Sequence, residues 1–189
     1  MRGRHRWLVC FVALAVVAAC RAAHAQDESR FEIRNAYVEL SNDVWQLDVR
    51  LDLGLAYAAQ QAFEEGVPLV LKLDIEASVD RRFLPDETVV SLTRRWQLAY
   101  DAISQRYVVT NTKSGEHVSH ASQEDALEAL ARISGIDIAE SATLPPDSRF
   151  DMRVRASVDI GDLPEAVKML LFWKTWSRST DWYAWKVRP

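Results

Sequence analysis

The sequence predicts an α+β domain dominated by strands, with a mostly antiparallel sheet, in a β-sandwich-like or meander arrangement, and two or three short helices. Three stretches show the period-2 alternation of apolar and polar residues that half-buried strands require, namely residues 45–53, 69–77 and 150–160. Helical spacing is confined to short segments, two of which end near glycine. Tight turns between successive strands imply a meander, and no linker or internal repeat divides the chain.

The strands follow one another closely along the chain. We expect them at residues 31–40, 45–53, 69–77, 89–100, around Tyr107 and Val109, 150–160 and 182–187. Ser41-Asn42-Asp43 joins the first two into a hairpin, residues 101–105 form a tight connection, and Lys113-Ser114-Gly115 turns the chain again.

Three short helices are predicted between these strands. Residues 56–65 are rich in alanine and glutamine and stop at Gly66. A second helix begins at the N-cap Ser122 and is expected to run to Gly135. Its apolar positions at helical spacing are Ala126, Leu127, Leu130 and Ile133. A third follows Pro164 and carries Ala166, Met169, Leu170 and Trp173.

The amino terminus has the layout of a signal peptide. Arg2, Arg4 and Arg6 precede an apolar run over residues 7–20, which is shorter than the roughly 20 residues that span a bilayer comfortably. Cleavage after Ala25 leaves residues 1–25 as the signal peptide and 26–189 as a single exported, periplasmic domain. As alternatives, residues 17–20 resemble a lipobox that would make a membrane-tethered lipoprotein lipidated at Cys20, or the segment stays as an uncleaved anchor.

Removing this leader changes the charge and the cysteine content. Four arginines and no acidic residue leave with it, so the formal net charge falls from −4 to −8. An acidic domain lacks the basic face that nucleic-acid binding needs, and we expect no nucleic-acid partner. Both cysteines, Cys10 and Cys20, lie in the leader, so we expect no disulfide and no thiolate metal site in the domain.

Several short motifs in a fixed order resemble the exported bacterial proteins grouped as "domain of unknown function 4390". The residues that carry this resemblance are Gly66-Val67-Pro68-Leu69, Ser91-Leu92, Arg95-Trp96-Gln97-Leu98 leading to Tyr100, Arg106-Tyr107, Ala126-Leu127 with Gly135, Trp176 and Asp181-Trp182. They span nearly all of the chain after the leader. The resemblance implies a Gram-negative cell-envelope protein of unestablished function, with a link to envelope signalling, and it supplies no catalytic residues.

The familiar catalytic motifs are missing from the sequence. It has no nucleophile elbow, phosphate loop, dinucleotide-binding turn or zinc-protease helix. His117 and His120 would point to opposite faces of a strand, and Ser122 is better explained as a helix cap than as a nucleophile. We therefore expect no enzyme, no metal site and no cofactor.

Charged residues on the predicted strands have two interpretations. The carboxylates Asp48, Asp52, Asp74 and Glu76 could include a general acid and base, but Arg50 and Lys72 on the same faces favour cross-strand ion pairs. Arg94 falls on the apolar face that carries Trp96, where an unpaired charge would be costly. Either a β-bulge resets the alternation there, or Arg94 stacks on an aromatic neighbour or binds an anion beside Trp96.

Aromatic residues concentrate near the carboxyl terminus. The cluster consists of Leu170, Leu171, Phe172, Trp173, Trp176, Trp182, Tyr183 and Trp185. The candidates for binding a partner are Trp176, Trp182, Tyr183 and Trp185. Packing of the whole cluster in the core is the alternative, since one of the alternating pairs in the last strand must face inward.

These observations favour a noncatalytic interaction module whose partner is a membrane or envelope protein. A carrier of lipid or another small ligand is the first alternative, and a carboxylate-dependent envelope hydrolase acting through residues such as Asp48 and Asp74 is the second. A carrier would bring Arg94, Trp96 and Trp182 together on a concave, incompletely filled surface. A filled core would count against it.

Overall fold

The computed structural model describes residues 30–188, except residues 56, 80, 82–85, 145 and 161–176. This part of the chain forms ten strands in two antiparallel sheets and two short helices. The prediction of a strand-dominated α+β domain is confirmed. Within the described ranges, no helix is both long enough and apolar enough to cross a membrane.

The small sheet has three strands in the order β1-β2-β7. These strands are β1 (Phe31–Ser41), β2 (Val44–Leu53) and β7 (Arg132–Glu140). The predicted hairpin between β1 and β2 is confirmed, and its two central residues, Asn42 and Asp43, have φ of 49° and 63°. Two successive left-handed residues match the right-handed twist of the flanking strands, which explains why this short turn fixes the hairpin register.

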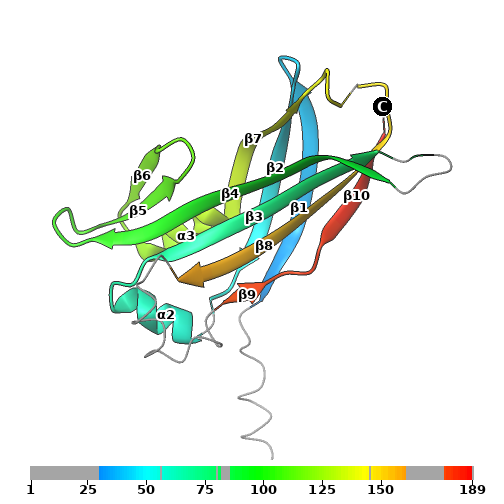
Figure 1. Ribbon diagram of the computed structural model, residues 1–189. Helices are drawn as coiled ribbons and strands as arrows, with labels where there is room; N and C mark the ends of the chain where they lie inside the picture. The colour runs from blue at the N-terminus through cyan, green and yellow to red at the C-terminus, as the bar shows by residue number, and fades with distance from the viewer. Residues whose placement is uncertain are drawn as a thin grey trace, which may run out of the picture.

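The large sheet has seven strands. Its order is β10-β8-β3-β4-β5-β6, and β9 pairs with β8 beside β10. The bounds are β3 (Leu69–Val79), β4 (Glu87–Asp101), β5 (Arg106–Asn111), β6 (His117–His120), β8 (Phe150–Ile160), β9 (Arg178–Ser179) and β10 (Tyr183–Val187). Figure 1 shows the long strands of the two sheets as layers, with both helices toward the end where β1 begins.

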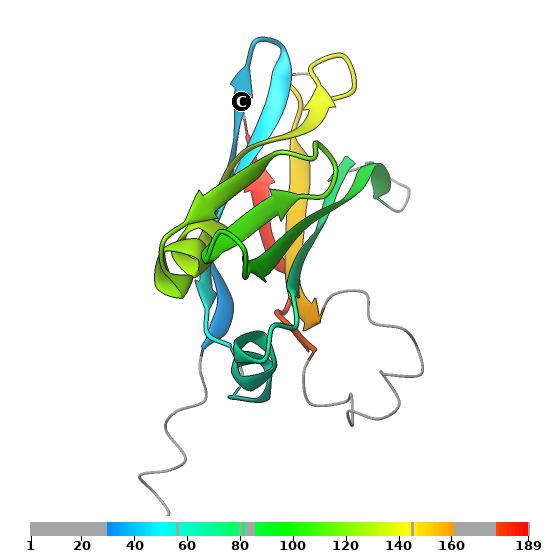
Figure 2. The same ribbon diagram turned by 90° about the vertical axis from the view of Figure 1, so that its left-hand side faces the viewer.

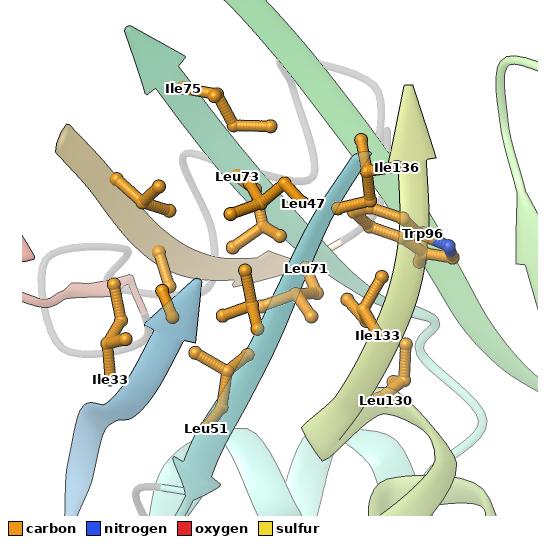
Figure 3. Packing of buried hydrophobic residues seen from close by; sticks show 14 of the residues in the cluster. Ile33, Leu47, Leu51, Leu71, Leu73, Ile75, Trp96, Leu130, Ile133 and Ile136 are labelled. Carbon is orange, nitrogen blue, oxygen red and sulfur yellow. The ribbon is translucent and has the colours of Figure 1, made fainter. Parts of the chain in front are cut away.

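The core lies between the two sheets and consists of the inward half of each alternating strand. Leu47 of β2, with Leu73 and Ile75 of β3, has no exposed surface, and each belongs to one continuous cluster. Burying a side chain of this size contributes about 1.5–3 kcal/mol. Figure 3 shows side chains of β2, β3 and β7 within the cluster. The inward-facing side chains of the alternating strands therefore supply most of the hydrophobic stabilisation.

The first described helix is α2 (Tyr57–Glu64). It buries Ala59, Ala62 and Phe63, which recur on one side of the helix. The chain leaves it through Gly66 with φ of 88°, and the N–H of Val67 donates to the carbonyl of Ala62 at 2.9 Å. The predicted glycine stop is confirmed.

The second described helix is α3 (Gln123–Ala131), which packs beside β5 and β6 (Figure 2). Its predicted cap is confirmed, because the N–H of Asp125 donates to the Ser122 hydroxyl at 3.1 Å. The predicted end at Gly135 is wrong. The helix stops at Ala131, and residues from Arg132 onward form β7.

The reason for this error lies in the irregular pairing of β7. Its buried residues are Ile133, Ile136 and Ile138, spaced by three and then two residues. The register with β2 shifts between Ile133 and Ile136, and Gly135 takes φ of 67° within this shift. A bulge therefore interrupts the period-2 pattern, so the sequence resembles the continuation of a helix.

Some predicted features fall outside the described residues. They are the leader of residues 1–25 with Cys20, the helix after Pro164 with Ala166, Met169, Leu170 and Trp173, and Trp176.

Candidate functional site

The outer face of the large sheet carries a row of charged side chains across β3 and β8. Their neighbour Leu73 is fully buried, so the alternation of the strand turns Asp74 and Glu76 away from the core. The register places Asp74 opposite Arg155 and Glu76 opposite Arg153. Residues of opposite charge thus lie directly across the β3–β8 pair.

Asp74 is the centre of this charged row. The Nζ of Lys72 lies 2.9 Å from its Oδ1, and the Nη2 of Arg155 lies 3.1 Å from its Oδ2. The Thr93 hydroxyl also donates to Oδ1 at 3.0 Å. Partial burial raises the pKa of the Asp74 carboxyl, but these hydrogen bonds outweigh the burial and leave the pKa below its ordinary value. The expected cross-strand ion pairing is confirmed for this residue.

Trp182 lies over the two arginines of the same face. The guanidinium carbons of Arg153 and Arg155 are each 4.7 Å from the centroid of its ring. Both distances fall within the range of cation–π attraction. Arg153 is held in turn by Glu76, whose Oε2 accepts from its Nε at 2.7 Å. We call Trp182, Arg153, Arg155, Asp74 and Glu76 the Trp182 surface.

A break between β9 and β10 places Trp182 on this surface. Ser179 pairs with Ser157 of β8, and Tyr183 pairs with Val154 of β8. The chain advances by four residues from Ser179 to Tyr183, whereas β8 advances by only three between their partners. One extra residue makes this a bulge. Thr180 holds the break in place, because its N–H donates to the Ala156 carbonyl at 2.9 Å and its hydroxyl accepts from the Ala156 N–H at 3.1 Å.

The other described aromatic residues of the carboxyl-terminal cluster point the opposite way. Tyr183 and Trp185 pack against the core, with their ring centroids 5.7 Å apart. Lys186 lies between inward-facing residues and pairs with Asp151 at 3.2 Å. The structure therefore separates the candidate residues, with Trp182 on the outer face and the next two aromatic residues turned inward.

Arg94 lies on the inner face of β4 without a bulge beside it. The β3–β4 register runs unbroken from Leu69 opposite Leu98 to Ala77 opposite Val90, and it places Arg94 opposite Leu73. The expected β-bulge at Arg94 is therefore wrong. Its guanidinium instead reaches across to the small sheet, where Nη2 donates to the backbone carbonyl of Asp137 in β7 at 3.0 Å. This bond lowers the cost of holding a charge beside the core.

Trp96 and Trp182 do not share a surface. Trp96 is only 8% exposed and belongs to the core cluster on the inner face, whereas Trp182 lies on the outer face with Arg153. A hollow of about 340 Å³ adjoins Arg94 and Trp96, and the loop that turns at Lys113 forms part of its wall. The three residues that a carrier was expected to bring together are thus divided between two faces of one sheet.

A protein-family model matches nearly all of the folded chain. Residues 28–186 match the family model described as "Domain of unknown function (DUF4390)". The chain belongs to the DUF4390 family. No curated protein and no solved structure matches it.

The two carboxylates suggested for a hydrolase are far apart in the DUF4390 domain. Asp48 lies on the outer face of the small sheet, where it accepts from the Tyr37 hydroxyl at 2.6 Å and from the N–H of Gly135 at 2.8 Å. Asp74 lies on the outer face of the other sheet. The hydrogen bond to Asp48 raises the pKa of the Tyr37 hydroxyl above its ordinary value. Asp48 and Asp74 therefore cannot act on one bond as an acid–base pair.

The two histidines of the DUF4390 domain lie on the short edge strand β6. His117 is exposed, whereas the Nε2 atom of His120 is buried without a hydrogen-bond partner in the described part of the chain. No group of three metal-binding side chains occurs among the residues that the structure describes.

Sequence reasoning missed Arg153 and Arg155. Their signal is present in the sequence, because both alternate with the buried residues Met152, Val154 and Ala156 of β8. Their contact with Trp182 had no such signal, since it depends on the extra residue between β9 and β10.

Proposed function

We propose that this DUF4390 protein is a noncatalytic interaction module of the cell envelope, with the Trp182 surface as its binding face for a membrane or envelope protein. The observation that carries the proposal is the half-buried Trp182 held over Arg153 and Arg155. Tryptophan and arginine are the residue types most enriched among the energetically dominant contacts of protein interfaces.

The geometry supports binding because the charged groups of the Trp182 surface are already fixed. Arg153 and Arg155 each have a carboxylate partner from β3 in addition to the indole ring. A surface ordered before binding loses less side-chain entropy when a partner arrives. The neighbouring strand β10 ends the sheet order, so an extended segment of a partner could also pair along it.

The leader supports a location in the envelope. Residues 1–25 have the layout of a signal peptide, and cleavage after Ala25 would release the domain into the periplasm. Lipidation of Cys20 would instead tether the same domain to a membrane. Intact-mass measurement of the protein from cells separates these two outcomes, and either location gives access to a membrane partner of an envelope-signalling system.

The test is crosslinking in intact cells, followed by affinity purification and mass spectrometry. We compare the native protein with Trp182→Ala and with Tyr57→Ala, a matched control that removes an aromatic residue 76% exposed on α2. Trp185 is left unchanged because it packs against the core. Thermal unfolding verifies that each variant is folded.

We expect a specific envelope protein that is enriched with the native chain and with Tyr57→Ala, and lost with Trp182→Ala. Enrichment that is the same for all three chains would exclude the Trp182 surface as the binding face. The absence of any enriched protein over the control would argue against an interaction module.

A further inference from the structure

A cleft lies at the end of the small sheet, on a part of the molecule that the Trp182 surface does not include. Its volume is about 870 Å³, and its walls come from β1, β2, α2, α3 and the start of β7. Leu51, Leu53 and Leu127 give it an apolar part, and Gln60 and Gln123 contribute side-chain amides. The size is within the usual range of sites for small molecules, about 300–1,000 Å³.

Three arginines line this cleft on adjacent strands. Arg50 on the central strand β2 is directly opposite Arg132 of β7, and Arg34 of β1 lies at the bulge next to the residue that pairs with Arg50. Like charges directly opposite one another destabilise an antiparallel pair. The fold therefore places two arginines directly across the β2–β7 pair, where opposite or neutral residues would be more stable.

In the described part of the chain, only two of these arginines form an ion pair with a carboxylate of the cleft. Arg34 pairs with Asp52 at 2.7 Å, and Arg132 pairs with Glu128 one helical turn before it. Arg50 has no ion pair and no hydrogen bond with any residue that the structure describes. The remaining carboxylate of the cleft, Glu124, lies exposed in the first turn of α3.

We propose that this cleft binds a phosphate monoester through the guanidinium groups of Arg50 and Arg132, with an apolar part of the ligand against its leucines. A phosphate monoester carries nearly two negative charges at neutral pH and presents three oxygens. Guanidinium groups from two directly paired residues supply the planar donors that its oxygens accept, and Arg50 adds a positive charge that no ion pair with a described residue offsets. This site is independent of the proposed function, and its ligand is either a soluble phosphate ester or the headgroup of a lipid.

The test is isothermal titration calorimetry on the protein purified from cells, with phenyl phosphate as the probe and phenol as the uncharged control. Dihexanoyl phosphatidic acid, kept below its micelle concentration, forms the lipid arm. We compare the native chain with Arg50→Met and with Arg95→Met, a matched control on an exposed arginine of β4 that lies outside the cleft.

We expect saturable binding of phenyl phosphate that phenol does not reproduce, weakened about tenfold in Arg50→Met and unchanged in Arg95→Met. Glu124→Gln should strengthen binding, because it removes a negative charge beside the ligand. Tighter binding of dihexanoyl phosphatidic acid than of phenyl phosphate would identify the ligand as a lipid headgroup. Tighter binding of phenyl phosphate would identify it as a soluble phosphate ester.

The proposal is overturned if neither phosphate probe binds saturably, or if Arg50→Met and Arg95→Met weaken binding equally. Thermal unfolding confirms that the Arg50→Met chain is folded, and Arg50→Lys, which keeps the charge but loses the planar donor pair, should show an intermediate loss. Trp182→Ala should leave these titrations unchanged, so the outcome does not depend on the interaction-module proposal.

Discussion

Replacing Thr180 with valine should destabilise the domain, because Thr180 holds the break that places Trp182. Valine keeps the shape of threonine but removes the hydroxyl that accepts from the Ala156 N–H at 3.1 Å. Ala156 is fully buried and Thr180 is 9% exposed, so water cannot replace the lost acceptor. A buried donor left without a partner costs about 1–3 kcal/mol. We expect a decrease of that size in the free energy of unfolding.

The assay is urea unfolding followed by tryptophan fluorescence, which yields the free energy and its dependence on urea concentration. In a domain of this size, each kcal/mol should also lower Tm by about 2–4 °C. Thr112→Val is the matched control, because the Thr112 hydroxyl donates to an Arg95 carbonyl that already accepts the Thr112 N–H. That change should cost less than about 0.5 kcal/mol. Equal effects of the two substitutions would refute the role given to Thr180.

Two further predictions concern pH and backbone conformation. Folding lowers the pKa of Asp74 below its ordinary value of 3.8, so the ionised carboxylate stabilises the fold fully at pH values above 3.8. This stabilisation is lost as the pH falls through the lower pKa of the folded state. Asp74→Asn should therefore reduce the unfolding free energy at pH 7 and flatten its decline in acid, and an unchanged acid profile would contradict this. Gly135→Ala should lower the free energy of unfolding in urea by about 1–2 kcal/mol, because the φ of 67° at this position strains any residue with a Cβ. Steric clash is not the cause, since no atom lies within 4 Å of the added carbon. Ser134→Ala, on an exposed neighbour, should have little effect, and equal losses would rule out backbone strain as the cause.

The sequence was most informative where one face of a strand is buried and the pairing is regular. Strands β2, β3 and β8 alternate without interruption, so their inward faces could be predicted residue by residue. The glycine stop of α2 and the Ser122 cap of α3 were equally accessible, because each depends on residues close in sequence. Local rules therefore predicted the elements that local contacts determine.

The features that escaped prediction depend on partners distant in the sequence. Strand β7 has a bulge at Gly135 that hides its alternation, and only its pairing with β2 shows it to be a strand. The inward position of Arg94 depends on a carbonyl of that same unpredicted strand. The position of Trp182 depends on an extra residue whose presence is visible only against β8. From the sequence, the candidate site could be narrowed to the aromatic residues near the carboxyl terminus. The contact of Arg153 and Arg155 with Trp182 could not be predicted.

The bond from Arg94 to the Asp137 carbonyl also bears on self-association. Strand β7 ends the small sheet, and a strand in that position offers backbone acceptors to other chains. Arg94 takes up one of these acceptors and brings a positive charge to the rim of the sheet. A second molecule that docked its own strand there would have to displace this guanidinium. The residue that interrupts the apolar face of β4 thus occupies a backbone acceptor on the outermost strand of the small sheet.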